Sequence, residues 1–243
     1  MAKSYTRNKE LKQPDEFISL SHRAWTFISD HATRVLVMLG VAVVIVAAAW
    51  TWSYFREAQA EKATAAFGRA LDIYYAPVST EPAKAAKDDD DDTPHFSTRL
   101  KKLEAAETEF SKVVDGHAGK EVARMALLLR AGVRFERARF DEAIADYDRF
   151  LKESTDKALR TSALEGLIYC YEARNLLDKA IETIKKLPGE GEQRYLALYH
   201  EGRILALKGQ VKEAVARFKQ IQQKGSPALA SRAGERLAML EGK

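Results

Sequence analysis

The sequence predicts an all-α protein in which one N-terminal transmembrane helix precedes an α-solenoid of about four helix pairs and a C-terminal capping helix. Three observations lead to this prediction. An uncharged apolar run of 21 residues lies near the N-terminus, and a pattern of small and large residues recurs after it at intervals of 34 to 37 residues. Helix-favouring residues dominate the remainder, and no segment alternates polar and apolar residues as a strand would.

The uncharged run covers residues 35–55 and is bracketed by Arg34 and Arg56. As a helix it would be about 31 Å long, which matches the hydrocarbon core of a bilayer. A helix of a soluble domain would be expected to carry a polar stripe, and this run has none. Three aromatic residues gather at one end, where an interfacial belt would lie: Trp50, Trp52 and Tyr54. These features predict a membrane-spanning helix.

A cleaved signal peptide is the nearest alternative, because Ala47–Ala49 resembles a small-residue cleavage site. However, 34 residues precede the apolar run, which is longer than an ordinary signal n-region, and the run continues past the alanines. An uncleaved anchor is therefore favoured.

The charge bias across the span is weak. Residues 1–34 carry six Lys and Arg residues, against five in residues 56–89. By the positive-inside rule this predicts a cytoplasmic tail (1–34) and a C-terminal domain (56–243) outside the cytoplasm. The inverted topology, with a cytoplasmic adaptor domain, stays open. In the tail, apolar residues of the segment 15–34 suggest an amphipathic helix on the inner leaflet or a continuation of the membrane helix: Phe17, Leu20, Ala24, Trp25, Phe27 and Ile28.

Four segments after the span share a pattern: an alanine is followed four positions later by a large apolar or aromatic residue. These pairs are Ala106 and Phe110, Ala143 and Tyr147, Ala180 and Ile184, and Ala214 and Phe218. This spacing is typical of the second helix of a tetratricopeptide unit, where a small side chain lets two helices approach and a bulky one fills the adjacent space.

The first helices fit the same scheme. Two of them are followed by turns that contain Asn175 and Gly209, respectively. In the third, the spacing from the first helix to Ala143 is one residue short, so either the turn at Ala138 and Arg139 is shortened or the register of the helix is off by one. The shifted register would bury Arg130 and Arg134, so the shortened turn is preferred. With the shortened turn, three arginines lie on a solvated face: Arg130, Arg134 and Arg137.

The first unit is irregular. Its helices are predicted at residues 57–75 and 99–114, separated by an acidic loop insertion at residues 76–98 that contains five consecutive aspartates. At the other end, Ser226 and Pro227 predict the N-cap and first turn of the capping helix.

The chain shows no sign of catalysis, a metal site, a cofactor, a nucleic-acid stripe or a small-molecule substrate. Its five histidines are scattered, and His200 fits a satisfied surface residue. The single cysteine, Cys170, fits a small buried apolar residue, and the net charge of +4 comes with interspersed charges of both signs. The chain is therefore expected not to be an enzyme.

A solenoid of this kind binds extended peptides or helices on a concave face lined by its first helices. The predicted peptide-binding residues on this face are Leu129, Val133, Glu165, Tyr169, Glu172, Leu196, Tyr199 and Arg203. An apolar and aromatic surface with a few charges suits unfolded or loosely folded polypeptide more than an acidic tail or a phosphate. An equally weighted alternative is that half of these residues only pack against the neighbouring unit.

A short tail ("KQPDEFISLSHRAWTFISDHATR"), one span and a repeat array together resemble the single-pass bacterial inner-membrane family known as the ancillary subunit of the Sec translocon. The resemblance implies a periplasmic repeat domain that associates with the translocon and periplasmic chaperones and helps secreted polypeptides reach folding factors. The acidic insertion departs from this family pattern. A membrane-tethered scaffold for an envelope assembly or cell-division complex is the alternative: it would have one tight partner, whereas a chaperone-like module would bind many apolar peptides weakly.

Overall fold

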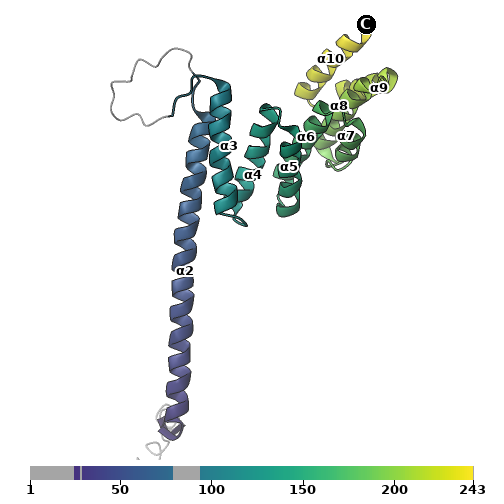
Figure 1. Ribbon diagram of the computed structural model, residues 1–243. Coiled ribbons are helices and arrows are strands. Elements are labelled where there is room, and N and C mark those ends of the chain that lie inside the picture. The colour runs from purple at the N-terminus through teal and green to yellow at the C-terminus, as the bar shows by residue number, and fades with distance from the viewer. Residues whose placement is uncertain (1–24, 28, 79–93, 243) are drawn as a thin grey trace, which may run out of the picture. The chain divides into compact units, whose positions relative to one another are not determined.

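The computed structural model describes residues 25–27, 29–78 and 94–242. Within these ranges all regular secondary structure is helical, and an isolated bridge joins Val78 to Phe96. The helices follow one another along the chain (Figure 1): α2 (Ala32–Tyr75), α3 (Arg99–Gly116), α4 (Glu121–Glu136), α5 (Phe140–Glu153), α6 (Lys157–Ala173), α7 (Leu177–Ile184), α8 (Gly191–Leu207), α9 (Val211–Lys224) and α10 (Pro227–Glu241). The all-helical prediction is confirmed.

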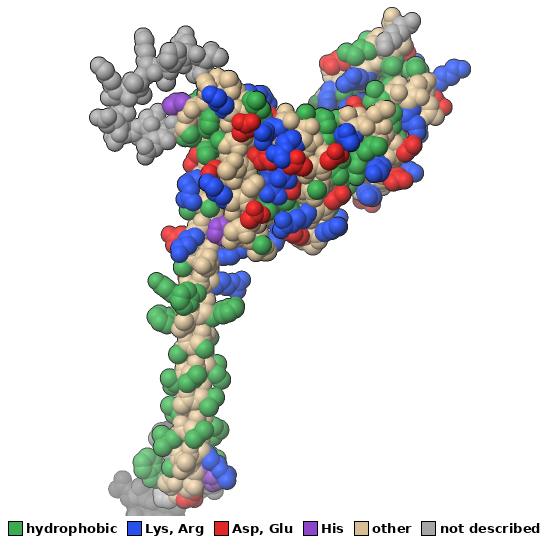
Figure 2. Space-filling view, viewed as in Figure 1, with side chains coloured by type: hydrophobic (Ala, Val, Ile, Leu, Met, Phe, Trp, Pro, Cys, Tyr) green, Lys and Arg blue, Asp and Glu red, His purple; other side chains and the backbone are tan. Residues whose placement is uncertain are grey.

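The chain divides into two compact units, residues 1–59 and 60–243, and the division falls inside α2. In the first unit the side chains of residues 36–55 are all exposed, and Figure 2 shows apolar groups in green along the visible face of this helix. Thr51 donates a 2.7 Å hydrogen bond to the Ala47 carbonyl, so its hydroxyl is satisfied within the helix. Among the described residues, α2 alone is long and apolar enough to cross a membrane.

Two predictions fall largely outside the described residues. The proposed amphipathic segment lies there up to residue 24 and again at residue 28, while Trp25 and Phe27 are described and exposed. The acidic insertion lies there from residue 79 to residue 93.

The second unit is built of helix pairs. The C-terminal part of α2 pairs with α3, and α4–α5, α6–α7 and α8–α9 follow, with α10 at the end. The four repeated alanines have no exposed surface, and the large residue one turn after each is buried. At Gly202, an added Cβ would lie 2.9 Å from the Phe218 ring. Small residues therefore set the close helix approach, as the repeat predicts.

Three turns between paired helices have the same backbone geometry. Ala138, Asn175 and Gly209 each adopt a positive φ, of 58°, 55° and 77° respectively. The residue after each donates a hydrogen bond to the carbonyl five residues earlier, with lengths of 2.7 to 2.9 Å. This is the Schellman ending of a helix, in which a left-handed residue satisfies the last free carbonyls.

The shortened turn predicted at Ala138 and Arg139 is wrong. Each left-handed residue precedes the alanine of the second helix by five positions, in this unit as in the next two. The register of α4 is therefore shifted by one residue, which turns Arg130 inward: it is only 7% exposed. The predicted solvated face is wrong too, because the side chains of Arg134 and Arg137 are only 16% and 17% exposed.

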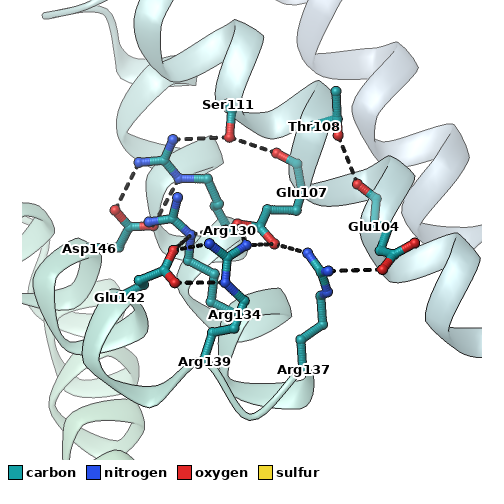
Figure 3. Close-up of polar contacts among 10 residues, drawn as sticks. All are labelled: Glu104, Glu107, Thr108, Ser111, Arg130, Arg134, Arg137, Arg139, Glu142 and Asp146. Atoms are coloured by element: carbon teal, nitrogen blue, oxygen red, sulfur yellow. Dashed lines mark hydrogen bonds and ion pairs between the residues drawn. The ribbon is translucent and has the colours of Figure 1, made fainter.

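An ion-pair cluster explains how α4 tolerates inward arginines (Figure 3). Arg130 donates two hydrogen bonds of 2.8 Å to the carboxylate of Asp146 on α5. Arg134 bridges the same carboxylate and Glu107 on α3, at 2.8 and 2.9 Å. Each buried charge therefore has an opposite charge within hydrogen-bond distance, which is the condition for burying it.

Glu107 is the centre of this cluster. It also accepts hydrogen bonds from Arg137 and Arg139, and Arg137 reaches Glu104 as well. Burial raises the pKa of Glu107, but the hydrogen bonds from Arg134 and Arg137 outweigh burial, so the net pKa is lowered. Four arginines face four carboxylates in the cluster: Arg130, Arg134, Arg137 and Arg139 with Glu104, Glu107, Glu142 and Asp146.

The candidate protein-binding surface

Two close approaches between alternate helices are found on the first-helix side of the stack. α4 packs against α6, and α8 packs against α10. No comparable approach joins α3, α5, α7 and α9 to one another in the described part of the chain. The stack therefore curves towards its first helices, and their free sides form its inner surface.

A row of aromatic and arginine side chains crosses this inner surface from α4 to α10. We call it the aromatic–arginine row: Phe135, Tyr169, Tyr199, Arg203 and Arg232. The Phe135 and Tyr169 ring centroids are 6.3 Å apart, and the Arg203 guanidinium lies 4.8 Å from the Tyr169 ring. The Arg232 guanidinium lies 4.5 Å from the Tyr199 ring. Such contacts are favourable cation–π pairs and hold both cations in place.

Arg203 is fixed by several partners. One guanidinium nitrogen donates to the Glu172 carboxylate on α6, and another lies 3.2 Å from Nδ1 of His200. Its side chain is only 11% exposed. Arg203 therefore joins α6 to α8 while its flat face covers Tyr169.

His200 supports the row from beneath. It is fully buried, its ring centroid lies 5.4 Å from that of Tyr169 and 6.0 Å from that of Tyr199, and Nε2 is 3.6 Å from a carboxylate oxygen of Glu165. The prediction of a surface histidine is wrong. Nothing in the local sequence signals the burial, because the covering rings come from two different helices.

Most of the predicted site residues gather here. Glu165, Tyr169 and Glu172 are partly exposed on α6, and Arg203 lies beside them on α8. Tyr199 is 4% exposed, so it forms the floor of the surface under Arg232. The structure brings these five side chains into one continuous region.

The other three predicted residues contribute to packing. Val133 has no exposed surface and belongs to the core, so it is not part of an open face. Leu129 and Leu196 are partly buried against the cores of their units. The one-residue error in the register of α4 explains why Val133 and Leu129 were wrongly assigned to the open face. Phe135 precedes the left-handed Ala138 by the same number of residues as Glu172 precedes the left-handed Asn175, so Phe135 is the residue of α4 equivalent to Glu172.

Neither a cluster of metal-ligating side chains nor a reactive thiol is found among the described residues. No group of three or more His, Cys, Asp or Glu side chains in the described ranges could hold a metal ion. Cys170 is buried, as predicted, and burial raises the pKa of its thiol to about 12, which keeps it protonated and unreactive.

A comparison with protein-family models gives a match to residues 25–236, described as a tetratricopeptide repeat-like domain. No curated protein matches the chain in sequence. The match covers most of the chain, including the apolar part of α2, and agrees with the helix pairs and the Schellman turns. The chain belongs to the tetratricopeptide repeat-like domain family.

Proposed function

We propose that this protein is a membrane-anchored module that binds other proteins through the inner surface of its repeats. The observation that carries the proposal is the aromatic–arginine row, which presents rings and cations from α4, α6, α8 and the capping helix α10 on one face. Aromatic and arginine side chains are the groups that dominate protein–protein interfaces. A surface continuous over several units suits an extended polypeptide better than a small molecule.

The anchor is proposed from the exposure of the apolar run. Large side chains between residues 36 and 55 are 53% to 75% exposed. Apolar surface costs about 25 cal/mol per Å² in water, so a fully exposed helix of this composition would be strongly driven into an apolar phase. A bilayer provides that phase along the whole uncharged length.

The orientation and partners are proposed from the charge bias and the resemblance to the Sec ancillary family. The tail is placed in the cytoplasm and the repeat domain in the periplasm of a bacterial inner membrane. There the inner surface would take secreted polypeptides leaving the translocon and pass them to periplasmic chaperones. The rival function is a scaffold with one fixed partner in an envelope assembly or cell-division complex.

Fusions at Lys243 test the orientation. Alkaline phosphatase, which is active only outside the cytoplasm, is expected to be active there, and a fluorescent protein that matures only in the cytoplasm is expected to stay dark. The opposite pair of results would overturn the periplasmic proposal and leave a cytoplasmic adaptor. The number of partners separates the two functions: binding to many unrelated unfolded polypeptides supports the chaperone-like role, and a single tight partner supports the scaffold.

A further inference from the structure

The C-terminal end of the inner surface carries cations that the protein itself does not neutralise. Neither Arg232 nor Arg236 on α10 has a carboxylate within 4.0 Å in the described part of the chain. Three nearby carboxylates are engaged by other cations: Glu172 by Arg203, Glu201 by Arg217 and Glu241 by Lys219. Glu235, which lies between the two arginines in the sequence, is exposed and is not within 4.0 Å of either guanidinium. Two positive charges one helical turn apart are therefore available to a partner.

Arg232 is held in place before any partner arrives. Its guanidinium lies 4.5 Å from the ring of Tyr199, which is buried and contacts Phe218 edge-on at 5.9 Å between centroids. Burial lowers the pKa of Arg232, but the phenols of Tyr199 and Tyr169 outweigh it and the net pKa is raised. A cation fixed in this way loses little side-chain entropy on binding.

An apolar pocket lies beside Arg236, one helical turn along α10 from Arg232. Its volume is about 250 Å³, and Leu207, Phe218 and Met239 contribute apolar walls between α8, α9 and α10. Arg203 and Arg236 line it as well, next to Glu172. The volume is below the range of about 300–1,000 Å³ that is typical of small-molecule sites, so one large side chain fits better than a metabolite.

We propose that this end of the inner surface binds an extended acidic peptide segment, with one large apolar side chain in the pocket and flanking carboxylates on Arg232 and Arg236. The proposal rests on the proposed function and specifies the chemistry of the partner. On α6, Glu172 is engaged by Arg203, so it does not cancel the two free charges, and Glu165 does not line the pocket. Cations beside an apolar pocket give charge selectivity together with an anchor.

Fluorescence anisotropy with the full chain in detergent micelles tests the proposal. The probe is a labelled Gly-Ser peptide with a central Asp-Glu-Phe-Asp-Glu, compared with one in which Lys replaces each acid and one in which Gly replaces Phe. We expect the acidic probe to bind about tenfold more tightly than the lysine probe, because two exposed pairs contribute together about 1–2 kcal/mol. Loss of Phe should weaken binding, and added salt should reduce the preference for acid.

The decisive variant is Arg232→Gln/Arg236→Gln. Its matched control is Lys212→Gln/Lys224→Gln, which removes the same charge from exposed positions on α9. The arginine variant should bind the acidic and lysine probes equally, and the control should keep the preference. The proposal is overturned if the wild-type chain does not prefer acid, or if the arginine variant retains the preference. Equal binding of both probes at the inner surface would leave the proposed function standing, whereas no binding of any probe there would contradict both.

Discussion

The guanidinium of Arg130 and the carboxylate of Asp146 form two parallel hydrogen bonds of 2.8 Å, with both side chains less than 10% exposed. This buried pair joins α4 to α5 and fixes the register of α4 within the α4–α5 helix pair. Removing Asp146 leaves Arg130 in the core without a carboxylate, whereas removing Arg130 leaves Asp146 with Arg134 as its remaining partner.

Asp146→Leu is therefore expected to lower the free energy of unfolding by about 3–5 kcal/mol, because Arg130 stays buried without a carboxylate. Arg130→Met/Asp146→Leu should regain most of that loss, because an apolar pair of similar volume needs no compensating charge. Urea denaturation followed by circular dichroism measures both variants. A double variant as unstable as Asp146→Leu would show that the pair is not the source of the effect.

The lowered pKa of Glu107 predicts acid sensitivity. A carboxyl group whose pKa is lower when folded contributes its full stabilisation above the pKa of an unfolded glutamate, about 4.3, and loses it as the pH falls through the folded-state pKa. Glu107→Gln should be less stable than wild type at pH 7 and should show a shallower loss of stability below about pH 4.3. Equal acid slopes for the two proteins, measured by denaturation at a series of pH values, would contradict this.

The left-handed turn residue predicts opposite effects at two equivalent positions. Ala138 has a φ of 58°, where a Cβ costs about 1–2 kcal/mol, whereas Gly209 occupies the same position in a later unit without that cost. Ala138→Gly should therefore stabilise the domain by about 0.5–1 kcal/mol after the added freedom of the unfolded chain is subtracted. Gly209→Ala should destabilise it. Thermal unfolding that moves both variants in the same direction would refute the shared turn geometry.

Gly166 makes room for Tyr147. A Cβ at this position would lie 2.2 Å from Cζ of the tyrosine ring, while at Gly68 an added Cβ meets nothing within 4 Å. Gly166→Ala should destabilise by about 1–3 kcal/mol through overpacking, and Gly68→Ala should stabilise by up to about 1 kcal/mol through helix propensity. Chemical denaturation of the two variants compares them directly; equal effects would mean that the Tyr147 ring does not limit the space.

The repeat architecture could be predicted because its determinants are local. A small residue at Ala106 and a large one at Phe110 lie one turn apart, and Asn175 and Gly209 mark turns by their own backbone preference. These signals located the second helices and two of the three turns.

The register of α4 could not be predicted in the same way, because Arg130 gains its partner from Asp146 on another helix. The assumption that arginine side chains lie on the solvent-exposed face therefore led to the wrong register. The burial of His200 and the position of Arg232 over Tyr199 likewise depend on contacts between residues far apart in the sequence. The register of α4, the burial of His200 and the position of Arg232 are determined by charge and ring contacts between residues far apart in the sequence. The periodicity of apolar residues carries no information about such contacts.

Site-specific photocrosslinking in cells tests the central claim, that the inner surface binds protein partners, most directly. A benzophenone amino acid at Tyr169 is expected to form adducts with secreted polypeptides, translocon components or chaperones, identified by mass spectrometry. The same group at Lys212, exposed on α9, is expected to form few or none of these adducts. Adducts of equal yield from both positions, or none from Tyr169, would contradict the assignment of the aromatic–arginine row as the binding surface.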